Sequence, residues 1–359
     1  MYDATRYAVT EDGVHLAYQV TGEGPVDLVM VPGFISHVEH RWREPALARF
    51  LRSLGTFSKV IGFDKRGMGL SDRDPVDATP SLSQRVADIG TVMDAAGSRR
   101  AVLFAWSEGG ATAIRFAITQ AERTAGLILV GTTPRFSAAP DFPAGIPREL
   151  LELAVEVWQE EWGKGVSLPL YAPSAVDDAR FAAWWAAYQR HSASPGAVAN
   201  SLMMHFDVDV RPDLPNLRVP TLIVHQINDM VIPVTCARYA AAHIPSSTYC
   251  ELPGSDHMYW LGDQRDTIDS IRRFLVDSVA GEAVKRRPRR PAFGWDSLTP
   301  TELEVAWAVG EGLTTRQIGE RLFVSPRTVQ SHITSILRKM GANKRSAIAA
   351  EAARRYPQP

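Results

Sequence analysis

The chain has 359 residues, of which 45% are hydrophobic and 22% charged, and its formal net charge is −1. This composition is typical of soluble globular proteins and excludes disordered and collagen-like classes, while the length predicts two domains. The chain lacks a run of 18 apolar residues and an N-terminal signal pattern, so we expect neither a membrane span nor secretion. Only Cys236 and Cys250 are present, which favours a reducing cytoplasm. Without a His/Cys cluster at ligand spacing, we expect no metal site and no cofactor.

Residues 1–280 alternate strand-like and helix-like segments, the pattern of an α/β sheet. The first segment, 7–20, is typical of a β-hairpin that turns at Asp12-Gly13. Short apolar runs then predict buried strands of a mostly parallel sheet, at 26–31, 58–63, 101–106, 126–131 and 220–225.

A segment of about 135–212 breaks this rhythm with helix-like sequence, which we interpret as a cap inserted into the sheet domain. Its tryptophans either line an apolar pocket for a small ligand or pack against the sheet domain. They are Trp158, Trp162, Trp184 and Trp185.

The segment Ala105-Trp106-Ser107-Glu108-Gly109 follows a buried strand and precedes a helix, as a nucleophile elbow does. The sharp turn excludes bulky side chains two residues before and after the serine, and alanine and glycine meet that demand. We therefore expect Ser107 to be the catalytic nucleophile, with the Glu108 amide in the oxyanion hole at a helix N-terminus. A serine at this position is otherwise a helix N-cap.

A nucleophilic serine needs a base, and the base needs a group that orients it. His257 lies in a loop before the last helix of this part, and Asp229 follows a strand between the serine and the histidine. The chain order predicts a catalytic triad of Ser107, Asp229 and His257. Asp256 is an alternative acid, although its adjacency to the histidine makes the geometry awkward. The Phe34 amide, after the first buried strand, is the second expected oxyanion-hole donor.

Residues 1–280 resemble the α/β-hydrolase family over nearly their whole length. The resemblance implies an α/β-hydrolase fold with a helical cap and, for an enzyme, hydrolysis of an ester or related acyl bond. It is closest to hydrolase-like domains fused to bacterial signalling and nucleotide-cyclase modules. Ala105 replaces the usual first glycine of the elbow, and Val31-Pro32 replaces the common His-Gly opening of the oxyanion loop. The matching residues are Pro32-Gly33-Phe34, the stretch from Asp64 to Asp72, Ser107-Glu108-Gly109-Gly110, Asp229 and His257.

Charge is distributed unevenly along the chain. From Glu282 onward there are 14 lysines and arginines and 7 acidic residues, so the preceding part is net acidic. A basic end indicates contact with a polyanion, although chance surface composition gives the same pattern. Pro288 and Pro291 interrupt a basic run, and we interpret 281–293 as an extended linker that is either solvated or in contact with phosphates.

Residues 294–359 predict an all-α domain. N-cap signals at Thr299, Thr314 and Ser325 start three helices, and Gly341 ends the third. The third helix has one apolar face, and its other faces are polar and basic. Two such helices joined by a short turn predict a helix-turn-helix that reads the major groove, although an ordinary surface helix also has many polar residues.

This segment resembles the LuxR-type helix-turn-helix over most of its length, with matches that include Leu298-Thr299, Glu302, Thr328-Val329 and Lys339-Met340-Gly341. The resemblance implies double-stranded DNA as a partner, and a homodimer that pairs through the last helix, 344–355. The implied DNA contacts are base-facing Gln330, Ser331 and Thr334 and phosphate-holding Arg327, Thr328, Arg338 and Lys339.

The sequence therefore predicts a DNA-binding transcription regulator whose α/β-hydrolase-fold domain senses, and in one version also hydrolyses, a small apolar or aromatic molecule. The alternative is an active serine hydrolase or esterase with an accessory DNA-binding domain. A third hypothesis makes the front domain a degenerate interaction scaffold.

Overall fold

The chain forms two compact units, Tyr2–Arg287 and Pro288–Pro359, and each is described by itself. The predicted linker lies outside the described residues except for Phe293. None of the helices in the described part of the chain has the length and apolarity that a bilayer crossing requires. The computed structural model describes residues 4–73, 80–165, 167–245, 247–280, 293–322 and 324–355.

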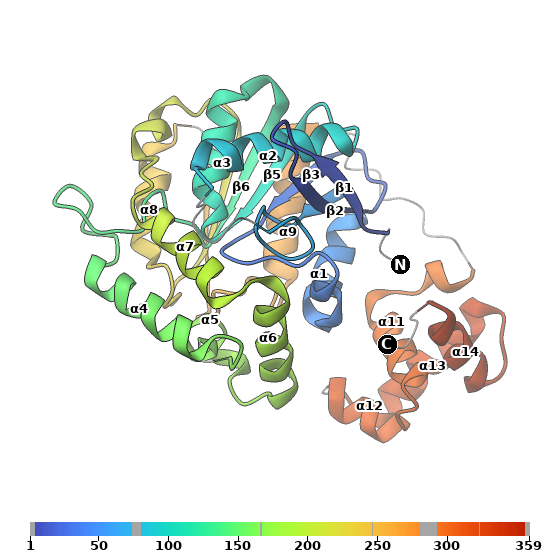
Figure 1. The fold of residues 1–359 in the computed structure, drawn as a ribbon. Coiled ribbons are helices and arrows are strands. Elements are labelled where there is room, and N and C mark those ends of the chain that lie inside the picture. The colour runs from blue at the N-terminus through green and yellow to red at the C-terminus, as the bar shows by residue number, and fades with distance from the viewer. Residues whose placement is uncertain are drawn as a thin grey trace. The chain divides into compact units, whose positions relative to one another are not determined.

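An eight-stranded sheet forms the centre of the larger unit, in the order β1-β2-β4-β3-β5-β6-β7-β8 (Figure 1). The hairpin β1–β2 and the pair β2–β4 are antiparallel, and the other neighbours are parallel. The prediction of a mostly parallel sheet after an N-terminal hairpin is therefore confirmed. The strands are β1 (Arg6–Val9), β2 (His15–Thr21), β3 (Asp27–Val31), β4 (Lys59–Phe63), β5 (Ala101–Trp106), β6 (Thr124–Val130), β7 (Thr221–Gln226) and β8 (Ser247–Leu252).

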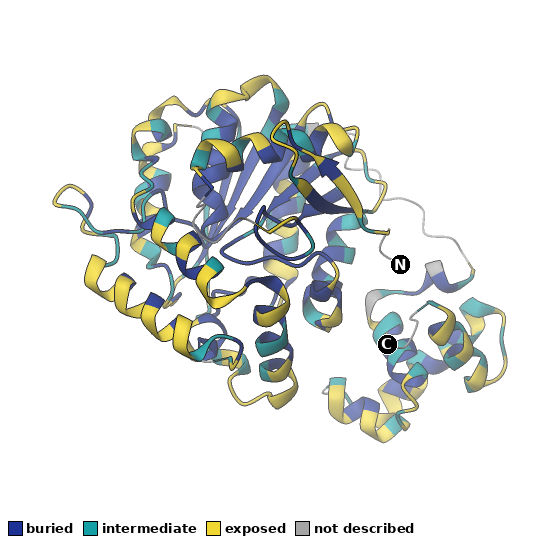
Figure 2. Ribbon diagram, viewed as in Figure 1, coloured by how far each residue is buried: buried dark blue, intermediate teal, exposed yellow. Residues whose placement is uncertain are grey.

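Helices cover both faces of this sheet, which is why its central strands are apolar without alternation. In β5 all six residues are buried: Phe104 belongs to the hydrophobic core on one face, and Leu103 to the core on the other. Figure 2 shows the central strands as a continuous buried layer. The first core includes residues of α1 (Pro45–Gly55) and α9 (Arg265–Phe274), and the second includes residues of α2 (Leu82–Ala95), α3 (Gly109–Thr119) and α8 (Val234–His243).

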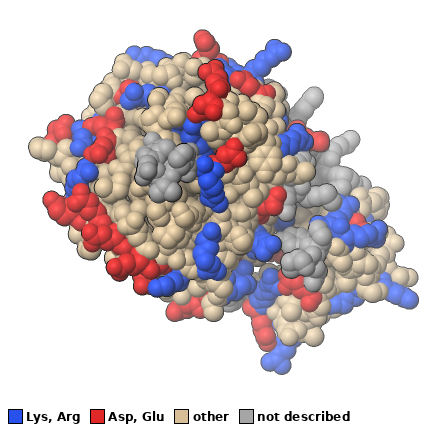
Figure 3. Space-filling view, in the orientation of Figure 1, with Lys and Arg blue, Asp and Glu red and all other residues tan. Residues whose placement is uncertain are grey.

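Four helices form a cap between β6 and β7: α4 (Arg148–Glu161), α5 (Leu168–Tyr171), α6 (Ala179–Ser192) and α7 (Pro195–Phe206). They fall within the segment that the sequence marks as an insertion. Their aromatic side chains turn inward, with Trp158, Trp185 and Tyr188 buried in the same core as α1 and α9. The outer side of α4 carries a row of glutamates, which Figure 3 shows as an acidic edge.

The smaller unit is a helical domain with its own core, of which Val305, Val329 and Ile348 are fully buried members. Each of its first three helices begins at the cap that the sequence indicates. In the first, Thr299 and Glu302 form a reciprocal capping box. The third helix ends at Gly341, which has a left-handed φ of 63°. The helices are α11 (Pro300–Gly310), α12 (Thr315–Leu322), α13 (Pro326–Met340) and α14 (Arg345–Arg355).

Candidate active site and DNA-binding helix

The strand-turn-helix at Ser107 has the backbone strain expected of a nucleophile elbow. Ser107 has a φ of 53°, and it is the only non-glycine residue with a positive φ in the described ranges. Such a conformation costs free energy and persists only where its surroundings enforce it. The start of α3 packs closely against the loop after β3, because a Cβ on Gly109 would lie only 2.6 Å from the Pro32 carbonyl oxygen. The elbow therefore presents the serine hydroxyl at the carboxyl end of β5.

In the predicted triad, His257 lies within hydrogen-bonding distance of both Ser107 and Asp229. His257 Nε2 lies 2.9 Å from Ser107 Oγ, and His257 Nδ1 lies 2.7 Å from Asp229 Oδ2. The exposed fractions are 3% for the serine, 2% for the histidine and 7% for the aspartate. One imidazole nitrogen can therefore accept the serine proton while the other donates to a carboxylate, in a site that excludes water.

Asp229 is fixed by the turn that follows β7. Its Oδ1 accepts the backbone amides of Val231 at 2.8 Å and Ile232 at 3.0 Å, which leaves Oδ2 directed at His257. Burial alone would raise the pKa of Asp229, but the positive charge of His257 and its hydrogen bond hold that pKa below the usual value. The acid of the site is therefore ionised at neutral pH and orients the imidazole.

The alternative acid, Asp256, has a different partner. Its carboxylate accepts the backbone amide of Ser174 at 3.0 Å and the Ser174 hydroxyl at 2.6 Å, so it fastens the cap to the loop that carries His257. The structure thus favours Asp229 as the acid, and it gives Asp256 a place in the packing of the cap.

The predicted oxyanion donors, the amides of Phe34 and Glu108, belong to segments that touch at the elbow. A Cβ on Gly33 would lie 2.9 Å from the Trp106 ring and 3.3 Å from Ser107 Cβ, so the loop after β3 passes directly against the serine. Within the described ranges, neither amide donates a hydrogen bond to another protein group. Both are thus available for an oxyanion, and their role stays a prediction.

A lysine that sequence reasoning did not single out connects these two segments. Lys65 Nζ donates to Glu108 Oε1 at 2.6 Å and to the Phe34 carbonyl at 3.0 Å. Its backbone amide also donates to Ser36 Oγ at 3.1 Å. The lysine lies in the stretch after β4 that carried the family resemblance, but nothing in its spacing indicated this contact. Lys65 therefore joins the oxyanion loop to the residue after the nucleophile.

Glu108 is the centre of a buried charge cluster. Besides Lys65, its Oε1 lies 3.1 Å from Arg85 NH1 and 3.3 Å from His205 Nε2, and Arg85 also donates to Ser201 of α7. Burial opposes ionisation of Glu108, yet the neighbouring positive charges hold its pKa at about 2. Burial lowers the pKa of Lys65 to about 7 and that of His205 to about 4. At neutral pH, Arg85 and Lys65 therefore supply the charge that balances the glutamate.

Aromatic side chains of the cap enclose the triad. The Tyr171 ring stands edge-on to the His257 ring, with centroids 5.2 Å apart. The Phe34 ring packs against Trp158 at 4.7 Å and against Tyr171 at 5.4 Å. These contacts place apolar, aromatic surface around the serine, so a ligand with an apolar or aromatic group fits the chemistry of the enclosure.

The third helix of the smaller unit, α13, has the two faces that the sequence predicts. Val329, Ile333 and Ile336 are buried against the other helices. Six of the seven predicted DNA-contacting residues are exposed: Arg327, Thr328, Gln330, Ser331, Thr334 and Arg338.

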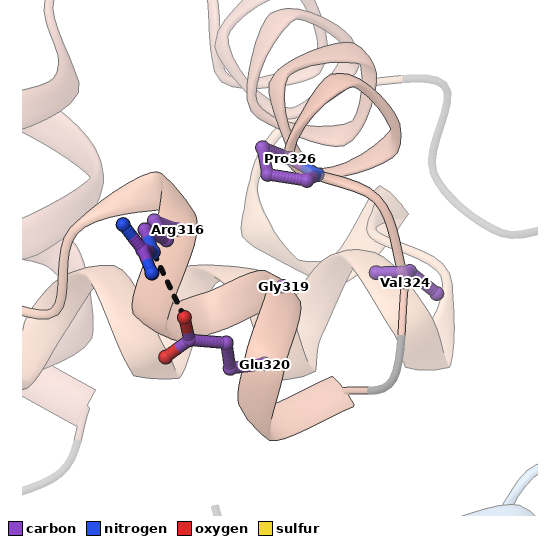
Figure 4. Close-up of a pocket in the computed structure, with 5 residues that line it drawn as sticks. All are labelled: Arg316, Gly319, Glu320, Val324 and Pro326. Atoms are coloured by element: carbon purple, nitrogen blue, oxygen red, sulfur yellow. Dashed lines mark hydrogen bonds and ion pairs between the residues drawn. The ribbon is translucent and has the colours of Figure 1, made fainter.

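The turn between α12 and α13 is compact, as Figure 4 shows. A Cβ on Gly319 would lie 2.7 Å from the Val324 carbonyl oxygen, so only glycine allows α12 to approach the turn this closely. On the same helix, Arg316 pairs with Glu320 at 2.9 Å. The turn therefore fixes the angle at which α13 leaves α12, as a helix-turn-helix requires.

Comparison with protein families covers both units. The model of the alpha/beta hydrolase family matches residues 28–270, which is more than half of the chain. The chain belongs to the alpha/beta hydrolase family. The model of the bacterial regulatory proteins of the luxR family matches residues 296–352, so a LuxR-type helix-turn-helix domain follows the hydrolase domain.

Similar proteins divide along the same line. A pimeloyl-[acyl-carrier protein] methyl ester esterase of Nitrosomonas europaea is 27% identical over 247 residues, which are 68% of this chain and 92% of that enzyme. A Mycobacterium tuberculosis protein named as an HTH-type transcriptional regulator is 55% identical over 67 residues. That match covers 19% of this chain and 8% of the mycobacterial protein.

Solved structures similar to this chain include several esterases and other hydrolases. An esterase of Exiguobacterium antarcticum superposes with a TM-score of 0.67 at 22% identity, over 76% of this chain and 99% of the esterase. An enol-lactonase of Burkholderia xenovorans superposes with a TM-score of 0.63 at 20% identity, over 76% of this chain and 100% of the lactonase. At these identities the likeness establishes the fold of the hydrolase domain.

Within the LuxR-type domain, Lys339 is placed differently from the other predicted DNA contacts. Its Nζ donates to Glu302 Oε2 at 2.6 Å and lies 3.3 Å from the Ser297 carbonyl oxygen, and its side chain is only 22% exposed. This ammonium already has a carboxylate partner in the capping box of α11. In this structure Lys339 holds α13 to α11, and the phosphate contact that the resemblance implies stays a prediction.

Proposed function

We propose that the chain, a DNA-binding regulator by its LuxR-type domain, binds DNA in a manner set by a small acyl compound held at Ser107. The observation that carries this proposal is the assembled triad, with a Ser107–His257 distance of 2.9 Å, beneath a closed aromatic cap. An enclosed site of this kind can hold a ligand long enough to bias the protein between two states.

The ligand class follows from the surroundings of the serine. A nucleophile with a base and two free amides fits a carbonyl carbon that becomes tetrahedral, and the aromatic cap fits an apolar or aromatic substituent. The similar enzymes named as methyl ester esterases support an ester or related acyl bond as the reacting group. We therefore infer an apolar ester or lactone as the compound sensed.

The chemistry of the site proceeds from the distances given above. Ser107 Oγ attacks the carbonyl carbon while His257 Nε2 takes its proton, and Asp229 stabilises the resulting imidazolium. The negative charge on the carbonyl oxygen is received by the amides of Phe34 and Glu108. The imidazolium then gives its proton to the leaving alcohol, which departs and leaves an acyl-serine.

On DNA, we propose that two copies bind together. By the resemblance to LuxR-type domains, pairing occurs through α14, and two α13 helices then enter successive major grooves. Gln330, Ser331 and Thr334 would contact base edges, and Arg327, Thr328 and Arg338 would contact phosphates. The exposure of all six side chains supports this assignment.

The proposal is tested with the full-length protein and DNA fragments taken from upstream of its own gene. Fluorescence anisotropy measures DNA affinity in the presence of aryl esters of increasing acyl length, with Ser107→Ala as the comparison. We expect at least one ester to change the affinity of the parent several-fold. The proposal fails if no ester changes DNA affinity while each is bound or consumed.

A second candidate function is that of an active serine hydrolase with an accessory DNA-binding domain. The triad distances of 2.9 and 2.7 Å favour it, since they match those of a competent acyl-transfer site. Continuous release of product from the same aryl esters, with no effect on DNA affinity, would establish this alternative.

A further inference from the structure

Arg41, in the short helix His40–Arg43, carries a buried guanidinium that makes no close ion pair, although it interacts electrostatically with the carboxylate of Asp64. The residue is 9% exposed, and no carboxylate of the described residues lies within 4.0 Å of its side-chain nitrogens. Its Nε is buried without a hydrogen-bond partner in the same part of the chain. The sheet makes room for it at Gly62 of β4, where a Cβ would lie 2.1 Å from Arg41 NH1.

A partly open cavity of about 60 Å³ adjoins this guanidinium beneath the loop that follows β3. Two further orphaned polar atoms belong to residues that line it. Trp260 Nε1 has no acceptor, and Asp64 Oδ1 has no donor, among the described residues. Gly33 and Trp106 also line the space and adjoin Ser107, which does not line it. The cavity is therefore separate from the triad.

The chemistry of Arg41 limits what can occupy this cavity. A guanidinium cannot discharge itself by losing its proton at physiological pH, so burial does not remove the charge. A buried charge without a counterion in contact is costly, and the planar set of N–H donors of a guanidinium matches a carboxylate. One water molecule needs about 15 Å³ of cavity volume. A cavity of about 60 Å³ therefore has room for roughly four non-hydrogen atoms, which is the number in acetate.

We propose that this cavity is a binding site for a small carboxylate of the size of formate or acetate, held by Arg41 with the Trp260 N–H as a further donor. The site is independent of the function proposed for Ser107. The cavity is lined by Gly33 and its neighbours after β3, so an occupant would pack against the oxyanion loop and limit its movement.

Asp64 decides how the affinity of the cavity for a carboxylate depends on pH. Its Oδ2 accepts the amides of Val38 at 3.1 Å and Leu70 at 2.9 Å, which leaves Oδ1 without a donor. Burial raises the pKa of Asp64 to about 6, while hydrogen bonds from the Leu70 and Val38 amides and the Ser36 side chain, and the charge of Arg41, oppose that rise. The other titratable groups that line the cavity are His37, whose pKa burial lowers to about 4, and Tyr188 and Tyr259, whose pKa values burial raises. Between pH 8 and pH 6, protonation of Asp64 therefore removes its repulsion and supplies a donor.

The test measures binding of sodium acetate and sodium formate to the full-length protein by calorimetry, with sodium chloride at matched ionic strength and acetamide as a neutral isostere. We expect acetate and formate to bind, more tightly at pH 6 than at pH 8, and neither chloride nor acetamide to bind. Butyrate and benzoate, which exceed the cavity, are expected not to bind. Arg41→Met should weaken acetate binding roughly tenfold or more.

The matched control is Arg52→Met, because Arg41 and Arg52 lie over the Trp42 ring at 5.6 and 5.7 Å, but Arg52 does not line the cavity. It should leave acetate binding unchanged. Absence of acetate binding to the parent, equal binding of acetamide, or full binding to Arg41→Met would each overturn the proposal. If Arg41→Met does not fold, the series of ligands on the parent protein still decides between these outcomes.

Discussion

The two candidate functional regions of the chain differ in solvent exposure. In the hydrolase domain the triad is enclosed, with Ser107 and His257 only 3% and 2% exposed. In the LuxR-type domain, Gln330 and Thr334 are exposed on α13. A developing oxyanion is stabilised best where water is excluded, whereas side chains that read base edges must project beyond the protein. We therefore expect ligand entry at the first region to require movement of the cap, and DNA binding at the second to use side chains that are already exposed.

The same contrast separates two lysine–glutamate pairs. Lys65–Glu108 and Lys339–Glu302 each have an N–O distance of 2.6 Å. The first pair lies beside the nucleophile and holds two loops together, and the second closes the start of a helix. Contacts of the same length thus lie beside the candidate nucleophile in one domain and at a helix cap in the other. The predictions that follow separate these roles, beginning with the largest effect.

Substitution of Ser107 tests the buried region most strongly. Ser107→Ala should lower hydrolysis of, or acylation by, short aryl esters by at least ~10³-fold, because the nucleophile is lost. DNA affinity without ligand should stay the same. Ester turnover and DNA anisotropy are measured on one preparation, and Ser247→Ala on β8 serves as the control. Retained acylation in Ser107→Ala would remove the serine from the chemistry.

Substitution of Lys65 tests whether its contacts with Phe34 and Glu108 position the two oxyanion amides. Lys65→Met should lower kcat by roughly 10- to 100-fold with little change in KM, since oxyanion stabilisation acts in the transition state. The pKa of Lys65 is about 7, so its ammonium is present below that pH and lost above it. The parent rate should therefore decline above pH 7. Lys65→Arg should remove that decline, because arginine keeps its charge. An effect on KM alone would contradict the positioning role.

Glu302→Ala tests the capping pair of the helical domain. It should lower the free energy of unfolding by about 2 kcal/mol, since it removes a capping box and a shielded ion pair. Burial opposes ionisation of Glu302, but its hydrogen bonds with Lys339, Ser335 and Thr299 hold its pKa at about 2. This pKa lies below the unfolded value, so the stabilisation is present above about pH 4.5 and is lost as the pH falls toward 2. Chemical denaturation at several pH values measures the loss of stability and its pH dependence. The control is Glu320→Ala, at an exposed position, which we expect to have a much smaller effect.

Arg338→Ala gives the smallest effect and separates phosphate contacts from structural ones. DNA affinity should fall by roughly 5- to 10-fold on all sequences. The slope of log affinity against log salt concentration should become shallower by about one, since one phosphate contact is lost. Lys339→Ala should instead lower domain stability and leave the salt slope unchanged, because Lys339 is paired with Glu302. A decreased slope in Lys339→Ala would restore the phosphate role that the sequence suggests.

The sequence predicted most helix boundaries of the helical domain, because the signals for them are local. The caps at Thr299 and Ser325, and the stop at Gly341, lie within a few residues of the helices that they bound. The strand-turn-helix at Ser107 is local in the same sense. Such patterns depend on backbone hydrogen bonds between near neighbours, so a single sequence shows them.

Contacts between distant segments were the part that the sequence did not show. Lys65 meets Glu108 across 43 positions, and Glu302 meets Lys339 across 37. Arg41 lies opposite Gly62 only because the sheet brings the strand and the loop together. No spacing rule encodes these pairs, since they depend on how whole elements pack. The sequence therefore predicted the surface face of α13 but did not indicate that Lys339 pairs with Glu302.

The central claim is that occupancy of Ser107 changes DNA binding, and covalent blocking of the serine tests it most directly. Full-length protein is treated with an aryl phosphonate that mimics the tetrahedral intermediate, and its affinity for a bound upstream fragment is compared with that of untreated protein. The account predicts a change of at least several-fold that is absent in Ser107→Ala. Stoichiometric labelling of Ser107, verified by mass spectrometry, with identical DNA affinity before and after would contradict it.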